Sequence, residues 1–336
     1  MIKAIAGKEF KDYLTGRRFI ILFGFLLTVT VLALLQVKYQ MMTWSAPGES
    51  HTFKVYEIMW GVNYYIGIIG GIFSLALGFD AITREREERT LKVLMGHPIF
   101  RDQVILGKLL GGALTLAVAV VITGMVMTGI LMWMGITINS YARLAAYFGF
   151  IYLYLLVFFT MAVAFSAYSK RSGNALMYAL VFFLALTIVV MSVAPIVAHY
   201  AAGPRPKMPE ELNTIRVRIS GGNTSMEDMQ KYKKLMEEYQ NKTMEWSRRY
   251  WKLQEYINII SPQYDFNQIA NYVLNPHMKS FEEMVSGEYT PNGGKPPEYS
   301  LMESLSFAKK EIIFMAAYLI AGFVAAYLGF VRAEIR

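Results

Sequence analysis

Six long apolar stretches constrain this sequence more than any other feature, because each is long enough to cross a lipid bilayer. A helix rises about 1.5 Å per residue, so about 20 apolar residues span a hydrocarbon core about 30 Å thick. Lipid offers the backbone no hydrogen-bond partners, so each stretch is predicted to be a helix. The predicted spans are residues 19–37, 58–79, 109–134, 144–167, 174–198 and 312–331. The sequence therefore predicts an all-α membrane protein with six transmembrane helices.

The distribution of charge predicts the orientation of these spans. Six crossings place both termini on one side, together with residues 80–108 and 169–173, and this side carries 15 Lys and Arg against 8 Asp and Glu. Short loops rich in Lys and Arg stay in the cytoplasm. We therefore expect a multi-pass protein of the cell membrane with both termini in the cytoplasm. Topology and contact with membrane lipids explain the net charge of +8, and the sequence contains no nucleic-acid-binding motif.

A dense block of mixed charge follows the second span. Seven of the nine residues from Arg84 to Lys92 are charged. Glu85 and Arg89 have the i,i+4 spacing, with the acid first, at which an ion pair stabilises a helix. Residues 80–92 are therefore predicted to continue the second helix out of the membrane.

The charged block leads into a short amphipathic piece, "TLKVLMGHPI". Leu91, Leu94 and Met95 share one face, and Gly96 with Pro98 ends the helix. An apolar face at the end of a charged stalk fits a groove on a partner protein. Spacing alone leaves open the alternative that this piece is a connector lying on lipid headgroups.

The segment "GFDAITREREERTLKVLMGHPIFRDQVILGKLLGG" resembles the signature of ABC-2 type (type V) transporter permeases. The pattern falls on Asp80, Glu85, Glu87, Thr90, Leu91, Leu94, Pro98, Arg101, Gly107 and Lys108. It departs at Arg89, where the family usually has Gly, so a less sharp bend is expected there. The six-span layout agrees with the resemblance. The sequence is also similar to the maturation permeases of nitrous oxide reductase, which belong to the same family. Residues 1–18 resemble the amphipathic connecting helix of the same family.

The resemblance implies that residues 80–108 contain a cytoplasmic coupling helix, which docks on a separate ABC ATPase subunit. The expected coupling residues are Glu85, Glu87, Glu88, Thr90, Leu91, Leu94, Met95, His97, Pro98 and Arg101. It also implies two ATPase copies and a second permease copy, as a homodimer, with a route between the permeases. The candidates on that route are Asn63, Tyr64, Met191 and Ser192. Ordinary packing between helices is the alternative for each of these four.

The motifs that the sequence lacks also restrict its function. No G-x-x-x-x-G-K-[ST] phosphate loop is present, so ATP and Mg²⁺ are expected on the partner ATPase, with no cofactor on this chain. The spans contain few ionisable residues, which disfavours an ion-coupled carrier. No cluster of His, Asp and Glu indicates an enzyme. Methionine is abundant, but we interpret it as a flexible apolar residue that fills gaps in packing, so no metal site is expected.

Residues 199–308 are predicted to form a helical extracytoplasmic domain between the fifth and sixth spans. Ser225 and Asp228 have the spacing of a helix N-terminus. Apolar residues then follow a 3.5-residue period along one seam, which predicts a long helix. The seam consists of Met229, Tyr232, Met236, Tyr239, Trp246, Tyr250, Leu253 and Ile257. This domain docks an external partner, caps an exit, or stabilises a dimer; the sequence leaves these three open.

The predicted organisation has four parts. They are a connecting helix at 1–18, transmembrane helices 1 to 5 at 19–198, the external domain at 199–308, and the last helix with a cytoplasmic tail at 309–336. The leading hypothesis is a non-catalytic permease subunit of an ATP-driven exporter. The second is a scaffold that passes ATPase-driven motion to an extracytoplasmic partner without moving a solute. The sequence does not identify a substrate.

Overall fold

The computed structural model describes residues 1–44, 54–90, 100–136, 138, 140–220, 225–279 and 297–332, and all regular elements in these ranges are helices. In chain order they are α1 (Ile2–Thr15), α2 (Arg17–Trp44), α3 (Val55–Gly78), α4 (Thr83–Glu87), α6 (Arg101–Trp133), α7 (Tyr141–Tyr168), α8 (Ser172–Leu184), the π-helix η1 (Ala185–Val189), α9 (Val190–Ala202), α10 (Glu210–Ser220), α11 (Met226–Asn258), α12 (Pro262–Leu274), α14 (Leu301–Phe307) and α15 (Lys309–Arg332).

Six helical stretches of the described chain are long and apolar enough to cross a membrane. They are Arg17–Gln40, Gly61–Glu87, Arg101–Trp133, Tyr141–Tyr168, Ser172–Ala202 and Lys309–Arg332. Each overlaps one predicted span, so the predicted all-α membrane fold is confirmed. The fifth stretch contains α8, η1 and α9, and the π-helix adds one wide turn within it.

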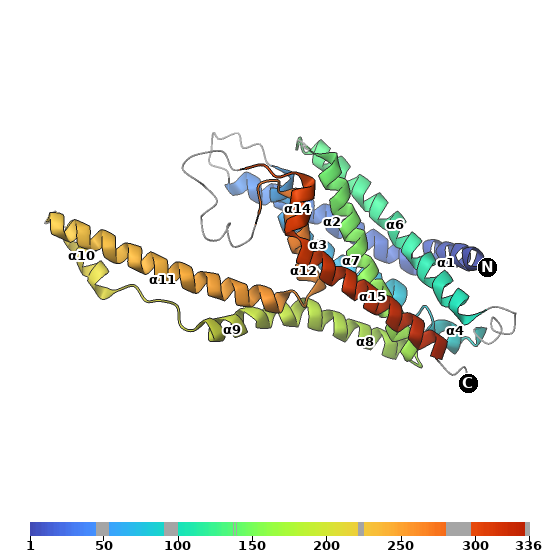
Figure 1. Cartoon of the computed structure of the whole chain (residues 1–336). Coiled ribbons are helices and arrows are strands. Elements are labelled where there is room, and N and C mark those ends of the chain that lie inside the picture. The colour runs from blue at the N-terminus through green and yellow to red at the C-terminus, as the bar shows by residue number, and fades with distance from the viewer. Residues whose placement is uncertain are drawn as a thin grey trace. The chain divides into compact units, whose positions relative to one another are not determined.

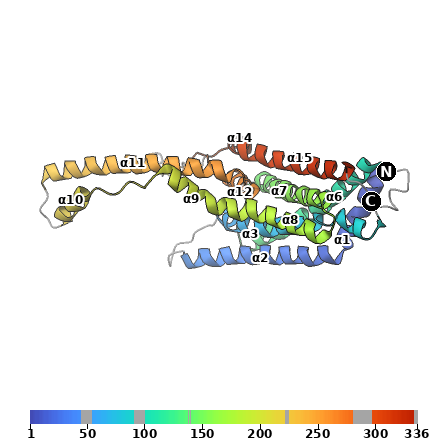
Figure 2. The same cartoon turned by 90° about the horizontal axis from the view of Figure 1, so that it is seen from below.

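The chain forms two compact units, and the first contains Met1–Val189, Ile259–Met278 and Glu298–Arg336. Within this unit α7 packs against α3, α6, α8, α12 and α15, so it lies at the centre of the bundle (Figures 1 and 2). Its Tyr147 and Tyr154 are fully buried. The helices α1 and α4 lie at one end of the unit with the C-terminal end of α15, whereas α12 and α14 lie toward the other (Figure 1).

The short helix α12 is packed inside this bundle, against α3, α7 and α15. Ser261 caps its start by accepting a hydrogen bond from the Tyr264 N–H at 3.4 Å. The Tyr154 hydroxyl lies 2.8 Å from Gln263 Oε1 and 2.9 Å from the Gly67 carbonyl oxygen. Gly67 leaves room for the Gln263 amide, because a Cβ there would lie 1.9 Å from Gln263 Nε2.

Residues 199–308, which are predicted to form the extracytoplasmic domain, include parts of both units. Residues 259–278, with α12, belong to the unit of the membrane helices. The physical reason is the apolar character of α12: Phe266, Ile269 and Val273 are completely buried. The residues that cover α12 lie far from it in the sequence, so a local pattern does not reveal this packing.

The second unit contains Val190–Asn258 and Lys279–Pro297. Its main element, α11, has 33 residues and is about 50 Å long. Ser225 Oγ accepts from the Asp228 N–H at 3.0 Å, as the capping pattern predicts. Of the seam residues only Met229 is exposed, while the other seven are half-buried. Trp246 Nε1 donates to the Gly203 carbonyl at 2.8 Å, which fixes the seam of α11 to the end of α9.

Candidate functional site

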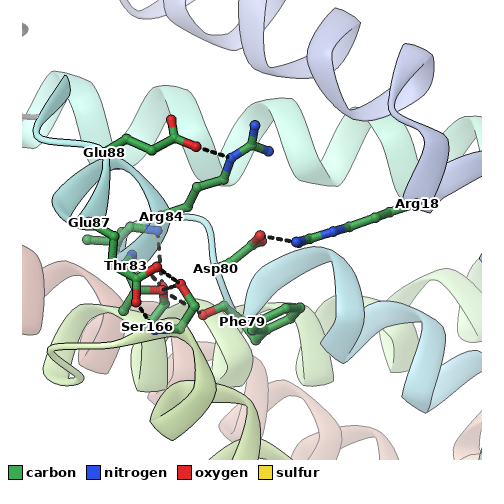
Figure 3. Close-up of polar contacts among 10 residues, drawn as sticks. Arg18, Phe79, Asp80, Thr83, Arg84, Glu87, Glu88 and Ser166 are labelled. Carbon is green, nitrogen blue, oxygen red and sulfur yellow. Dashed lines mark hydrogen bonds and ion pairs between the residues drawn. The ribbon is translucent and has the colours of Figure 1, made fainter.

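The helix of the second span is interrupted next to its charged end, and the candidate site begins there. α3 ends at Gly78 and α4 starts at Thr83. A new helix start exposes backbone N–H groups that have no partner within the helix. Ser166 on α7 supplies the acceptor, because its Oγ lies 3.0 Å from the Ile82 nitrogen and 3.1 Å from that of Thr83. The start of α4 is thereby fixed to α7, as Figure 3 shows.

Lys108 on α6 joins α4 to α1. Its Nζ is 2.7 Å from Glu85 Oε1 on α4 and 2.8 Å from Glu9 Oε1 on α1. The Lys108 side chain is only 2% exposed, and those of Glu9 and Glu85 are 13% and 19% exposed. A buried ammonium group requires compensating negative charge, so these three side chains depend on one another.

Two glycines on α6 let α1 come close enough for this arrangement. A Cβ at Gly107 would lie 2.6 Å from Ile5 Cγ2, and one at Gly111 would lie 3.0 Å from the Ala6 carbonyl oxygen. Ala6 is buried in the contact between the helices. The "LGKLLGG" segment thus places Lys108 between α1 and α4 by allowing close backbone approach.

The last turn of α4 is bonded to the start of α8. Glu87 accepts hydrogen bonds from the backbone N–H and the hydroxyl of Ser172, both at 2.8 Å. A carboxylate at a helix N-terminus is favoured by the helix dipole and satisfies a free N–H group. Next to it, Arg86 donates to the Ser169 carbonyl oxygen at 2.6 Å. Arg86 therefore binds the end of α7, and Glu87 binds the start of α8. Together they attach α4 to the short connection between these two helices.

A further contact reaches α2, where Arg18 forms an ion pair with Asp80 in the turn before α4 (Figure 3). With this pair, α4 and its preceding turn have polar contacts to α2, α6, α7 and α8, and Lys108 connects them to α1. We call this set of contacts the α4 junction. It consists of Glu9, Arg18, Asp80, Ile82, Thr83, Glu85, Arg86, Glu87, Lys108, Ser166, Ser169 and Ser172.

The prediction of an ion pair between Glu85 and Arg89 is wrong. Glu85 pairs with Lys108, and Arg89 adopts the left-handed conformation with φ of 57°. A residue in this conformation ends a right-handed helix, so the spacing of four residues no longer brings the two side chains together. Glu88 instead pairs with Arg84, at 3.0 Å. The expectation of a less sharp bend at Arg89 also fails, because Arg89 takes the backbone region that Gly occupies most easily.

A polar cavity of about 700 Å³ lies against the junction. Its lining includes Glu9, Asp12 and Tyr13 from α1, and Arg84 and Glu85 from α4. Burial raises the pKa of the Tyr13 hydroxyl well above its ordinary value, and the neighbouring carboxylates add to this effect. The tyrosine therefore stays protonated and able to donate a hydrogen bond into a mainly acidic surrounding.

Five of the ten predicted coupling residues are described. Glu85, Glu87 and Glu88 have the partners given above, Thr90 Oγ1 donates to the Glu85 carbonyl at 3.3 Å, and Arg101 donates to the Val331 carbonyl at 3.0 Å. The other five lie outside the described residues, and they are Leu91, Leu94, Met95, His97 and Pro98.

Sequence reasoning missed several junction residues. Glu9, Arg18, Ser166 and Ser172 come from four different helices, so no local spacing connects them to α4. The one available signal was Lys108, a charged residue at the start of an apolar span, which required a buried counter-charge.

The predicted path residues have different environments. Asn63 is 3% exposed and its Oδ1 accepts from the Tyr147 hydroxyl at 2.7 Å, which is a contact within the bundle. Tyr64, in contrast, is 53% exposed. In the second unit Ser192 is exposed and Met191 half-buried.

The described residues were also considered as metal ligands. Within them, His, Cys, Asp and Glu do not form any group of three or more that could hold a metal ion.

Comparison with known proteins places the whole chain in a family. A family described as ABC-2 family transporter protein matches residues 3–335. The chain belongs to this family. It is also similar to the "Probable ABC transporter permease protein NosY" of Pseudomonas aeruginosa, with 32% identity over 123 residues, which is 36% of this chain and 42% of that protein. The protein of the same name from Stutzerimonas stutzeri is 32% identical over 119 residues, 35% of this chain and 41% of its own length.

The matches to the NosY proteins span about two fifths of their length, whereas the family match spans nearly the whole chain. The resemblance to ABC-2 permeases seen in residues 78–112 is thereby confirmed. Together with the six apolar helices, family membership identifies this ABC-2 protein as a multi-pass membrane protein.

Proposed function

We propose that this ABC-2 protein is the membrane-spanning permease subunit of an ATP-driven exporter. A separate ABC ATPase, present in two copies with ATP and Mg²⁺, would bind it from the cytoplasm. Family membership, the six spans and the missing phosphate loop support this assignment. The charge distribution supports cytoplasmic termini, because the sides rich in Lys and Arg stay inside the cell.

The observation that carries the proposal is the α4 junction. The predicted docking piece begins at Thr90, and α4 ends only three residues earlier, at Glu87. Because α4 is bonded to α2, α6, α7 and α8, a force applied to residues 91–99 would reach four membrane helices at once. An isolated loop lying on lipid headgroups needs no such set of bonds to other helices.

The chain does no covalent chemistry in this mechanism. ATP-driven closure of the two ATPase copies would push α4, and the junction would turn that push into a change of angle between membrane helices. The route would lie between two copies of the chain. The exposed Tyr64 is available to such an interface, whereas Asn63 already has its partner inside the bundle.

The direct test is a pull-down of the ATPase that is co-expressed with the permease. Leu94→Arg places a charge on the proposed apolar docking face, and the expected result is loss of ATPase capture while the permease remains inserted. Met226→Arg is the matched control, because Met226 is an 83% exposed apolar residue of α11. ATPase capture that is equal in the Leu94→Arg variant and the parent would refute the docking assignment.

The alternative is a scaffold that transmits motion to an extracytoplasmic partner without transport. The length of α11 supports a scaffold function, because a 33-residue helix can transmit a displacement over about 50 Å. In this case ATP hydrolysis by the complex would respond to the partner and not to any solute. Reconstitution in sealed vesicles distinguishes the two functions, since only the exporter accumulates a cargo.

A further inference from the structure

A carboxyl group without a hydrogen-bond partner is enclosed in α12. Asp265 is 0% exposed, and neither of its side-chain oxygens receives a hydrogen bond within the described residues. One turn later on the same face, Gln268 is 6% exposed and its Oε1 also lacks a donor. An ionised carboxylate in such a site would be very costly, because the side chain is closed to bulk solvent and no described donor compensates its charge.

A second acid lies across the contact between α12 and α15. Glu311, in the first turn of α15, is 4% exposed and interacts electrostatically with Asp265. Tyr318, two turns further along α15, also interacts electrostatically with Asp265. Its hydroxyl donates a hydrogen bond to the Ile260 carbonyl at 2.6 Å. Two buried carboxyl groups that interact electrostatically cannot both be ionised at low cost.

Within the described residues, the hydrogen bonds of the other elements around α12 lead to partners other than Asp265. The Arg143 guanidinium on α7 donates to two backbone carbonyls and a serine hydroxyl. The Tyr154 hydroxyl on α7 is hydrogen-bonded to Gln263. On α3, Gly67 lies against the Gln263 amide. The residues of η1 are not ionisable. On α14, Glu303 caps its own helix, and hydrogen bonds from Ser300 lower its pKa, so it is ionised.

Both acids occupy the first turn of a helix, Asp265 in α12 and Glu311 in α15. The positive end of each helix dipole favours one negative charge nearby. Two buried charges would repel each other, whereas two neutral groups would leave both dipoles without a counter-charge. The arrangement therefore suits a pair that keeps one proton and one negative charge.

We propose that Asp265 and Glu311 form a proton-binding site between α12 and α15, in which the two carboxyl groups share a single proton. This inference goes beyond the proposed permease function and does not depend on it. When the proton leaves, the second negative charge repels α12 from α15. The packing of α12 in the bundle is therefore linked to proton binding.

The electrostatics agree with this geometry. Burial, with the repulsion from Glu311 added, raises the pKa of Asp265 to about 9. The proton consequently resides mainly on Asp265 at neutral pH. Release of the proton is expected only in alkaline solution.

Infrared spectroscopy of the purified full chain in lipid nanodiscs tests the site, because a protonated carboxyl group has its own C=O stretching band. The expected result is a band at neutral pH that is lost on titration above about pH 9 and that is absent in Asp265→Asn. Asp102→Asn is the matched control, since Asp102 is exposed, and it should keep the band.

Three results would overturn the proposal. They are the absence of the band from the parent at neutral pH, its persistence in Asp265→Asn, and its removal by Na⁺ or K⁺ at constant pH, which would indicate a metal-cation site. Glu311→Gln gives an independent check if Asp265→Asn does not fold. It should keep the band but lose it at lower pH than the parent, because the repulsion on Asp265 is gone.

Discussion

At the scale of single residues, the charges that this chain buries at the α4 junction have defined partners. Lys108 is nearly inaccessible and is held between Glu9 and Glu85. The helices α1, α4 and α6 therefore meet at one ammonium group. Loss of that group leaves two carboxylates facing each other with nothing to neutralise them.

Lys108→Met should lower the free energy of unfolding by about 3–5 kcal/mol, as expected when one partner of a buried ion pair is removed. Thermal unfolding in detergent would measure this loss. Adding Glu9→Gln and Glu85→Gln to Lys108→Met should restore most of the stability, because no unpaired charge remains. Lys3→Met, at an exposed position of α1, is the control that should change little. A triple variant as unstable as Lys108→Met would contradict the electrostatic explanation.

Arg89 occupies a backbone region that costs most side chains about 1 kcal/mol or more. Arg89→Val should therefore destabilise the protein by about 1–2 kcal/mol, because a β-branched residue fits this region worst. Arg89→Gly should be neutral or slightly stabilising, since Gly adopts the conformation without strain. Denaturation curves of the two variants give the comparison, and equal destabilisation by both would show that the side chain, and not the backbone, matters.

Asp265 should make the folded protein less stable as pH rises, whereas most acidic residues have the opposite effect. Its carboxyl stays protonated in the folded protein up to about pH 9, whereas the unfolded group releases its proton near its ordinary pKa of 3.8. The folded state then binds the extra proton, so stability falls as pH rises between these values. Asp265→Asn should raise the melting temperature at about pH 8 and change it much less at about pH 5. A similar shift at both pH values would disprove the linkage.

At the scale of elements, α12 is the feature that sequence analysis could not place. Its start has a local signal, because Ser261 caps the helix and Pro262 occupies its first turn. Its position inside the bundle depends on Gly67 and Tyr154, which lie about 200 and 110 residues away in the chain. Local patterns carry no information about such contacts.

Gly67→Ala tests the docking of α12, because the new Cβ would overlap the Gln263 amide. The expected result is partial release of α12 and faster thiol labelling of a cysteine introduced in place of the buried Ile269. The chain has no native cysteine to interfere. Gly149→Ala should leave labelling unchanged, since no heavy atom lies within 4 Å of its Cβ position. Equal labelling rates in the two variants would argue against the role of Gly67.

The membrane helices and α11 illustrate what the sequence does determine. Length and hydropathy alone predicted all six spans, because the bilayer imposes both requirements locally. The start of α11 followed from Ser225 and Asp228 in the same way. The α4 junction was only partly predictable: the acidic residues of α4 were identified, but Ser166 and Ser172 are inconspicuous without the fold.

At the scale of the whole molecule, the proposed coupling follows a path from residues 91–99 to the membrane helices. The α4 junction is the first part of that path that the structure describes. The bond between Glu87 and Ser172 is its most accessible link, because the carboxylate reaches the start of α8 at the surface. This link can be removed without a change in the buried charges.

The most direct measurement is thiol labelling of a single cysteine at Asn174, an exposed position in the first turn of α8, in the complex with the ATPase. The labelling rate should differ between the ATP-bound and nucleotide-free states. Glu87→Gln should reduce that difference while the ATPase still binds and hydrolyses ATP. A labelling rate that does not depend on nucleotide, or one that depends on it equally with and without the Glu87 carboxylate, would contradict the proposed coupling through α4.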